Sequence, residues 1–279
     1  MKSQPYSRVV IVGSSGPISL MLQERLRLCG VKTLCLGRSP QFSDVLISDE
    51  YETPNSEIGP ADFVIFLAWP TSRRDLRSQL GFVETTEKWA RFTKRVSATF
   101  LFISTTQAFS DSQSNYGRAK FAAERRVLEN SGYVLRVGLI VDDSLDCLAT
   151  RIRTSNLTRF LPRSIQILPV EPVSTHDFLD AVSRLVIHGP TDSMTYVCAQ
   201  PMISLRHLAT RSVASPPRVT KSLNFASKVL IRMPSFVRSA SLIDGLIGLT
   251  DRGDGHLSEQ ATFQNLSTQR WDENCFSRR

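Results

Sequence analysis

Tyr116 and Lys120 are the two side chains whose types and spacing best suit proton chemistry. They stand four residues apart in the stretch Asn115–Lys120, so on a helix both would project from one face. A phenol titrates near pH ~10 and is a poor acid or base at neutral pH, but an adjacent ammonium group favours the phenolate. The pair therefore predicts a proton-transfer group, although this spacing also occurs by chance.

A glycine-containing turn near the amino terminus predicts a site for an anionic ligand. The β-branched run Arg8–Val12 precedes it and apolar residues at helical spacing follow it, which predicts a strand, a turn and a helix. Gly13 would permit the tight turn, and Gly16 would let the backbone approach a pyrophosphate. Pro17 suits a first helical turn, whose free N–H groups attract anions. A single G-x-x-G is common in tight turns, so the rest of the chain decides its meaning.

Together these stretches resemble the extended short-chain dehydrogenase/reductase family of NAD(P)-dependent epimerases, dehydratases and reductases. The family's pattern is G-x-x-G-x-x-G after the first strand, L-A ending the fourth, a Ser/Thr pair ending the fifth, and Y-x-x-x-K on the next helix. The order of these elements is the specific part. The resemblance is good from Arg8 to about Val141, looser to about Ala199 and poor beyond. The matching residues are Gly13, Gly16, Leu67, Ala68, Ser104, Thr105, Tyr116 and Lys120.

The resemblance implies roles for these residues. Tyr116 would move the proton at the substrate oxygen, and Lys120 would tune Tyr116 and hold the nicotinamide ribose. Thr105 would orient the substrate carbonyl or hydroxyl. The residues implied to contact the dinucleotide are Gly13, Ser14, Ser15, Gly16, Ile18, Arg38, Ser39, Leu67, Ala68 and Lys120.

Arg38 and Ser39 bear on the choice of cofactor, because they follow the second expected strand, Val31–Leu36. In the dinucleotide fold an acidic residue near this point holds the adenosine ribose, whereas an arginine accommodates a 2′-phosphate. Arg38 therefore points to NADP, with NAD as the alternative. The other interpretation is an ordinary arginine in an exposed loop.

Three departures from the family's pattern leave a second function open. Ser19 replaces the third glycine and would push the first helix slightly outward. Trp69 and Pro70 replace the small residues usual there, and the indole would narrow the site, stack on a ligand or simply pack in the core. Only ten residues separate Thr105 from Tyr116, which trims a loop and opens the site or suits a smaller ligand. The alternative is a non-catalytic dinucleotide-binding regulator or scaffold, against which stands the intact set of Thr105, Tyr116 and Lys120.

The elements that must position these residues follow from hydrophobic periodicity. The apolar run Ala61–Trp69 predicts a central strand buried on both faces. Residues 72–95 predict a helix with Leu76, Leu80, Val83 and Trp89 facing inward. The run Pro169–Asp177 predicts a strand leading into a helix capped by Ser174, Thr175 or Asp177. Further strands are expected at 45–48, 99–103, 133–141 and 194–199, and further helices at 115–130, 145–160 and 204–213.

These elements predict a doubly wound, Rossmann-type α/β fold with a parallel sheet and a small carboxy-terminal substrate-binding lobe. Residues 1–144 would form the NAD(P)-binding domain, with the strand and helix around 165–188 returning to it. Residues 145–249 would form the lobe, where three arginines at 151, 153 and 159 line a helix face that meets a substrate phosphate or solvent. Residues 250–279 would form a polar tail, partly disordered.

Composition limits the ligands and partners. The 34 basic and 26 acidic residues give a net charge of +8, which suits an anionic ligand such as a dinucleotide or nucleotide sugar and equally a plain solvated surface. The basic residues are dispersed, so no specific nucleic-acid partner is expected. Residues 224–249 are too interrupted by charges and proline to span a bilayer; they would form helices of the lobe or lie on a membrane surface.

Cysteine and histidine usage points to a reducing compartment and no metal. The five cysteines form no C-x-x-C pair and the four histidines show no ligand spacing. The start Met1–Ser7 is polar and resembles no signal region, so a cytoplasmic protein is expected. The predicted function is an NAD(P)-dependent oxidoreductase or epimerase acting on a hydroxyl or keto group of a small substrate. A nucleotide-activated sugar is the first candidate from the family, and a homodimer is compatible with this function.

Overall fold

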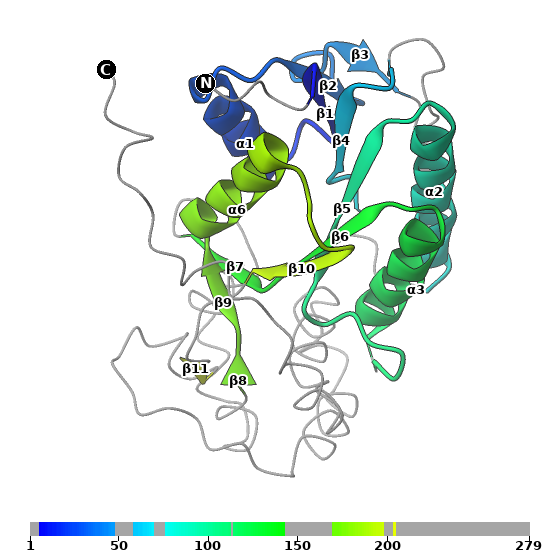
Figure 1. The fold of residues 1–279 in the computed structure, drawn as a ribbon. Coiled ribbons are helices and arrows are strands. Elements are labelled where there is room, and N and C mark those ends of the chain that lie inside the picture. Colours follow the sequence, from blue (N-terminus) through cyan, green and yellow to red (C-terminus); the bar gives the residue numbers. More distant parts are fainter. Residues whose placement is uncertain are drawn as a thin grey trace.

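A parallel sheet of seven strands lies at the centre of the fold (Figure 1). The structure is a computed structural model that describes residues 6–47, 58–69, 76–112, 114–142, 169–197 and 203–204. The strands of this sheet are β1 (Arg8–Val12), β2 (Thr33–Gly37), β3 (Val45–Leu46), β4 (Asp62–Phe66), β5 (Thr99–Thr105), β6 (Tyr133–Val137) and β10 (Met194–Val197). Their spatial order is β10-β6-β5-β4-β1-β2-β3, and every pair is parallel. The order reverses between β1 and β4, which confirms the predicted doubly wound fold.

Two pairs of helices cover the two faces of this sheet. Helices α1 (Pro17–Leu28) and α6 (Thr175–His188) lie on one face, and α2 (Leu76–Arg95) and α3 (Asn115–Glu129) lie on the other (Figure 1). Serine side chains start two of them. Ser114 Oγ accepts a hydrogen bond from Gly117 N at 2.8 Å at the start of α3. Ser174 Oγ accepts one from Asp177 N at 3.0 Å at the start of α6, which makes Ser174 the cap among the three predicted candidates.

The central strand β4 is buried at all five positions, as the apolar run predicts. Its side chains alternate between two cores: Val64 and Phe66 pack on the side of α2 and α3, and Phe63 and Ile65 on the side of α1 and α6. A strand that is apolar on both faces must be covered on both faces. This explains why helices flank the sheet on each side.

The prediction that Leu80 of α2 faces inward is wrong. Val83 and Trp89 are buried, but the Leu80 side chain is 46% exposed. The inward stripe of α2 instead runs through Gln79, which is fully buried, to Val83 and Thr86 at helical spacing. Leu80 lies one residue from Gln79 and is therefore rotated about 100° away from that stripe.

The strand predicted at 133–141 divides at Gly138. Gly138 N still donates to Val197 O of β10 at 2.9 Å, but Leu139 N donates to Glu171 O at 2.7 Å, so the chain leaves the main sheet there. The second part, β7 (Leu139–Val141), pairs in parallel with β9 (Pro172–Ser174). A further antiparallel pair joins β8 (Pro169–Val170) to β11 (Ile203–Ser204), so Ser204, which was predicted to begin a helix, lies in a strand. The predicted helix at 145–160, the segment 224–249 and the tail lie outside the described residues.

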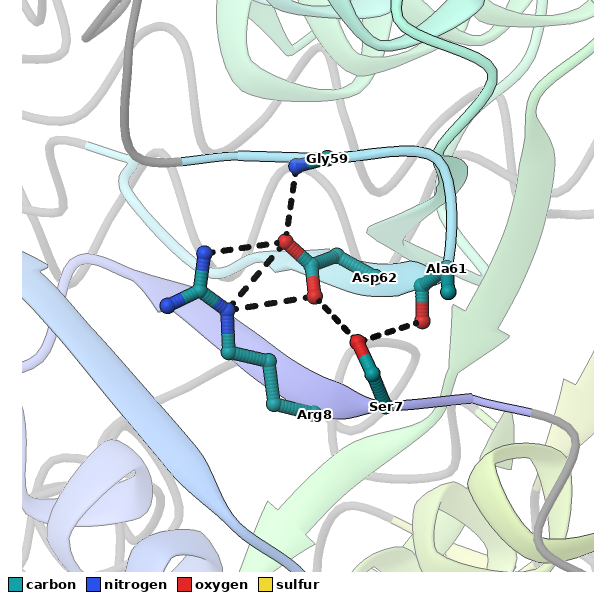
Figure 2. A network of polar contacts seen from close by, with 5 residues as sticks. All are labelled: Ser7, Arg8, Gly59, Ala61 and Asp62. Carbon is teal, nitrogen blue, oxygen red and sulfur yellow. Dashed lines mark hydrogen bonds and ion pairs between the residues drawn. The ribbon is translucent and has the colours of Figure 1, made fainter.

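A charged cluster joins β1 to β4 at their amino-terminal ends (Figure 2). The Arg8 side chain donates hydrogen bonds to both carboxylate oxygens of Asp62, at 3.1 Å each for Nε to Oδ1 and Nη2 to Oδ2. Gly59 N and Ser7 Oγ donate to the same carboxylate at 2.8 and 2.9 Å. Burial by itself raises the pKa of Asp62, but the bonds from Arg8, Gly59 and Ser7 bring the pKa below its usual value. The cluster therefore holds a buried negative charge and fixes the register of the two strands.

Two absences hold for the described part of the chain. No helix there is long and apolar enough to cross a membrane. No group of three or more His, Cys, Asp or Glu side chains gathers there as metal ligands would. Cys29 and Cys35, the cysteines within this part, are free thiols.

Candidate active site

Gly13 and the Leu67–Ala68 pair meet where the strand order reverses. Gly13 follows β1 with a φ of +94°, and a Cβ added to it would lie 2.7 Å from Ala68 N and 2.9 Å from Ala68 Cα. Leu67 N donates to Val12 O at 2.9 Å, which holds the two strand ends together. A glycine is required at 13 for both reasons, since its φ is positive and its neighbour is backbone. The glycine turn and the Leu67–Ala68 pair, which are far apart in the sequence, are thus in direct contact.

The start of α1 presents backbone N–H groups beside Gly13. Gly16 is the capping residue in an extended conformation, and no side chain of the described residues caps the helix. A Cβ built on Gly16 would meet, among the described atoms, Ser19 Oγ alone, at 3.7 Å. Ser15 is exposed, and Ile18 packs against the core. An uncapped helix start with open space in front of it suits a phosphate group.

Ser19, at the third-glycine position, is bonded to the turn rather than simply displacing the helix. It is 2% exposed, and its Oγ donates to Gly13 O at 2.6 Å. Gln23 Nε2, one helical turn further on, donates to Ser14 O at 3.0 Å. The sequence predicted that Ser19 would push α1 outward but did not reveal this hydrogen bond. A serine hydroxyl can bond to the turn where the glycine of the family's pattern would pack closely against it. The two bonds tie α1 to the turn.

A pair of serine hydroxyls lies at the end of β2. Ser14 is fully buried, and its Oγ lies 2.8 Å from Ser43 Oγ. A Cβ on Gly37 would be 2.5 Å from the first hydroxyl and 2.6 Å from the second, so a larger residue would displace both serine side chains. Arg38, which is exposed, and Ser39, which is half-buried, follow Gly37 directly. This is the strand end at which the dinucleotide fold places the adenosine ribose. The sequence did not reveal Ser43, because no local pattern marks it.

The first turn of α3 rests on the loop that follows β5. A Cβ on Gly117 would lie 2.5 Å from Gln107 O, so this glycine allows the close approach of helix and loop. Thr105 ends β5, is half-buried, and accepts a hydrogen bond from Gln107 N at 3.3 Å through Oγ1. The loop thereby links the strand end that carries Thr105 to the helix turn that carries Tyr116.

Lys120 lies under Tyr116 in an aromatic enclosure. Its side chain is 4% exposed, and Nζ donates to Ile103 O of β5 at 2.7 Å. The same nitrogen lies 4.1 Å from the ring centroid of Trp69, 4.4 Å from that of Phe102 and 5.8 Å from that of Tyr116. Burial lowers the pKa of Lys120 to about 7, against the opposing charge of Glu124. The structure thus brings Tyr116 and Lys120 together, as their spacing predicts.

Trp69 forms one wall of this site and is also packed in the core. Its Nε1 donates to Oε1 of the buried Gln79 at 2.8 Å. The indole ring lies 5.8 Å from Phe102 and 5.9 Å from Phe82 between centroids, and meets Tyr116 edge-on at 6.4 Å. Core packing, one of the interpretations of Trp69, is therefore correct, and the same ring narrows the surroundings of Tyr116.

Glu124 and Arg136 form a buried ion pair that the sequence did not reveal. Arg136 Nε and Nη2 donate to the two carboxylate oxygens of Glu124 at 2.8 and 2.6 Å, and the side chains are 6% and 1% exposed for Arg136 and Glu124. Burial raises the pKa of Glu124, and the bonds and charge of Arg136 oppose the rise. The spacing of four residues between Lys120 and Glu124 places Glu124 on the helix face of Lys120, but no local pattern indicates Arg136 as its partner.

No protein-family model matches the sequence, and no curated protein matches it. Solved structures do match in three dimensions, at low sequence identity. The reductase domain of the aureusimine biosynthetic cluster is 13% identical with a TM-score of 0.60, covering 98% of this chain and 89% of its own.

Two further matches are enzymes of nucleotide-sugar chemistry by name. The UDP-N-acetylglucosamine 4-epimerase from Bacillus cereus is 14% identical with a TM-score of 0.58, covering 72% of this chain and 79% of its own. The dTDP-4-dehydrorhamnose reductase from Bacillus anthracis str. Ames, solved with NADP, is 18% identical with a TM-score of 0.53, covering 77% and 85%. Identities this low compare folds rather than activities. The chain therefore has the doubly wound α/β fold that these epimerases and reductases share.

Proposed function

We propose that this protein is an NAD(P)-dependent oxidoreductase or epimerase of the extended short-chain dehydrogenase type, acting on a hydroxyl or keto group of a small substrate. The observation that carries the proposal is the meeting of Tyr116, Lys120 and the end of β5 at the carboxyl edge of the sheet, the edge at which Gly13 and Ala68 also meet. Ligands of doubly wound folds bind outside this edge, where the strand order reverses.

The residues around the glycine turn fit a nicotinamide dinucleotide. The close contact of Gly13 with Ala68, the open space at Gly16 and the uncapped start of α1 suit a pyrophosphate. Arg38 would hold the 2′-phosphate of NADP, with Ser39 beside it, and NAD is the alternative. When bound, the cofactor would supply hydride transfer. A match to a structure solved with NADP supports this choice of cofactor class.

The chain's own residues would handle the proton. Tyr116 would donate or accept it at the substrate oxygen, and the positive charge of Lys120 would favour the phenolate form that acts as base. Thr105 would orient the substrate through its hydroxyl. Trp69, edge-on to Tyr116, would exclude water from one side of the reacting oxygen.

A nucleotide-activated sugar is the proposed substrate class. Its diphosphate suits the net charge of +8, and two of the structural matches are named for nucleotide-sugar enzymes. Residues 145–249 would supply the lobe that recognises the sugar, with a substrate phosphate near the arginines at 151, 153 and 159. A cytoplasmic location and a homodimer belong to the same proposal.

A non-catalytic dinucleotide-binding regulator is the second candidate. Its support is the enclosure of Lys120, whose side chain is 4% exposed beneath Trp69. An ammonium group that is covered in this way has little surface left for a ribose hydroxyl. The intact pair of Tyr116 and Lys120 favours the enzyme.

The test is turnover of a panel of nucleotide sugars with NADP and NAD, comparing wild type, Tyr116→Phe and Tyr133→Phe. Tyr133, at the start of β6, is a matched control outside the site. Loss of the Tyr116 hydroxyl should lower kcat by about 10²–10⁴-fold and leave NADP affinity near wild type. Full activity of Tyr116→Phe would contradict the mechanism. Normal NADP binding with no turnover of any substrate would favour the regulator.

A further inference from the structure

Lys120 has an unusual set of partners for a buried cation. Among the described residues they are one backbone carbonyl, Ile103 O, and the faces of aromatic rings, of which Trp69 is the nearest at 4.1 Å. A cation within about 6 Å of an aromatic centroid is attracted by the negative face of the ring, and most strongly by tryptophan. The attraction grows where water is excluded, as it is around this side chain.

One charged group adds to the effect of the rings, because the charge of Glu124 raises the pKa of Lys120. On its own helix, Glu124 is the nearby acid, but both of its oxygens are bonded to Arg136 of β6. Tyr116 is the other titratable group that faces Lys120. The strand β5 contributes Phe102 and a carbonyl, neither of which carries a full charge. The ammonium form is therefore stabilised by the Ile103 carbonyl, by the faces of the aromatic rings and by the charge of Glu124, which Arg136 offsets in part.

The indole is fixed in the position that this contact requires. Gln79, fully buried on α2, accepts a hydrogen bond from Trp69 Nε1 at 2.8 Å. Phe82 of the same helix packs on the indole, with its centroid 5.9 Å away. Gln79 and Phe82 are thus the two residues of α2 that orient the Trp69 ring. Packing alone would not require the polar bond at Gln79.

We propose that Trp69 is a positioning residue for Lys120: its indole face, oriented by Gln79, stabilises the ammonium form beside Tyr116. The role in proton transfer rests on the proposed function, since an uncharged Lys120 would no longer favour the Tyr116 phenolate. The stabilisation of charge itself is a property of the protein alone, and it can be measured without any substrate.

The primary measurement is the titration of Lys120 by NMR of protein with ¹³C-labelled lysine side chains, with the Lys120 signal assigned by its loss in Lys120→Arg. In Trp69→Leu, the protonation equilibrium should shift about tenfold toward the neutral amine, because an apolar side chain keeps Lys120 buried and removes the ring. Circular dichroism checks that the variant is folded. An unchanged titration, or one shifted toward the ammonium form, would overturn the proposal.

Fluorinated tryptophan provides a second perturbation that keeps the packing. Fluorine weakens the negative face of the indole with little change in its shape, so the Lys120 titration should move progressively toward the amine as fluorine atoms are added. Trp69→Phe protein grown with the same fluorinated tryptophan is the matched control, because the fluorinated rings then lie elsewhere; its titration should not respond to fluorine. Equal titrations of fluorinated and ordinary wild-type protein would refute the proposal even if Trp69→Leu fails to fold.

The pH dependence of kcat is a measurement that a purely structural role of Trp69 would leave unchanged. If a substrate is found, kcat should fall at high pH as Lys120 loses its proton, and this limb should move to lower pH in fluorinated protein. Failure of every substrate would defeat the proposed function and leave the NMR result standing. A normal pH profile with an altered titration would show that Trp69 acts on Lys120 but that the lysine charge does not serve Tyr116.

Discussion

Three glycines that differ in φ and in surroundings allow the stability of the turn to be separated from its binding function. Gly13 has a φ of +94° and backbone in contact; Gly30 has a φ of +71° with no described atom within 4 Å of a built Cβ; Gly16 has neither a positive φ nor close contact. Replacing each by alanine adds the same methyl group. The three variants therefore isolate strain, steric overlap and ligand access.

The expected losses of unfolding free energy follow from these differences. A positive φ costs an alanine about 1–2 kcal/mol, of which the lower entropy of the unfolded chain returns about 0.4–1 kcal/mol. Gly30→Ala should therefore lose roughly 0–1.5 kcal/mol. Gly13→Ala adds a Cβ at 2.7 Å from Ala68 N, where backbone must move, and overlap of this kind costs a further ~1–3 kcal/mol. Gly16→Ala should change stability by less than about 1 kcal/mol.

Urea unfolding and NADP titration together check the series. Gly13→Ala should be the least stable of the three, and Gly16→Ala should be nearly as stable as wild type but bind NADP at least about tenfold more weakly, because its methyl group would occupy the space left for the pyrophosphate. Equal stabilities of Gly13→Ala and Gly30→Ala would refute the close contact with Ala68. Unchanged NADP affinity of Gly16→Ala would refute the proposed place of the phosphates.

Three other substitutions test separate parts of the fold and site. Arg38→Ala should lower the affinity for NADP about tenfold or more and leave that for NAD unchanged in the same titration; equal wild-type affinities for the two would contradict the assignment. Ser19→Gly should lower the free energy of unfolding by about 0.5–1.5 kcal/mol, since Gly13 O loses its hydrogen bond; a gain would mean that close helix packing matters more. Asp62→Asn should cost about 1.5–3 kcal/mol at neutral pH. The pKa of Asp62 in the folded protein lies below its usual value of 3.8, so the stability difference between wild type and Asp62→Asn should shrink as pH falls below about 4. A difference in unfolding free energy that stays constant in acid would contradict the role of the Asp62 charge.

Local sequence patterns predicted the features that depend only on neighbouring residues in the chain. The turn at Gly13, the apolar strand β4 and the helix spacing of Tyr116 and Lys120 all depend on neighbours in the chain, and the structure contains them. The order of these elements also predicted the doubly wound sheet, because parallel strands joined by helices leave few alternatives.

Contacts between distant residues could not be predicted in this way. Ser43 meets Ser14 across 29 residues, and Arg136 meets Glu124 across a turn and a strand, so neither pair has a local signature. Leu80 was assigned inward because it is apolar, whereas the polar Gln79 takes the buried position by bonding to Trp69. A buried polar residue that has a partner cannot be distinguished from an exposed one by hydropathy alone.

The pairing of β7 with β9 links the end of β6 to the start of α6. In this parallel ladder Leu139 lies opposite Pro172 and Val141 lies opposite Ser174, although the two strands are far apart in the sequence. Because β7 follows β6 across Gly138 and α6 begins directly after β9, the ladder holds the start of α6 beside the end of β6. A substitution that breaks this short ladder should therefore loosen α6 from the edge of the sheet at β6, even though the substituted residue lies outside the seven-stranded sheet.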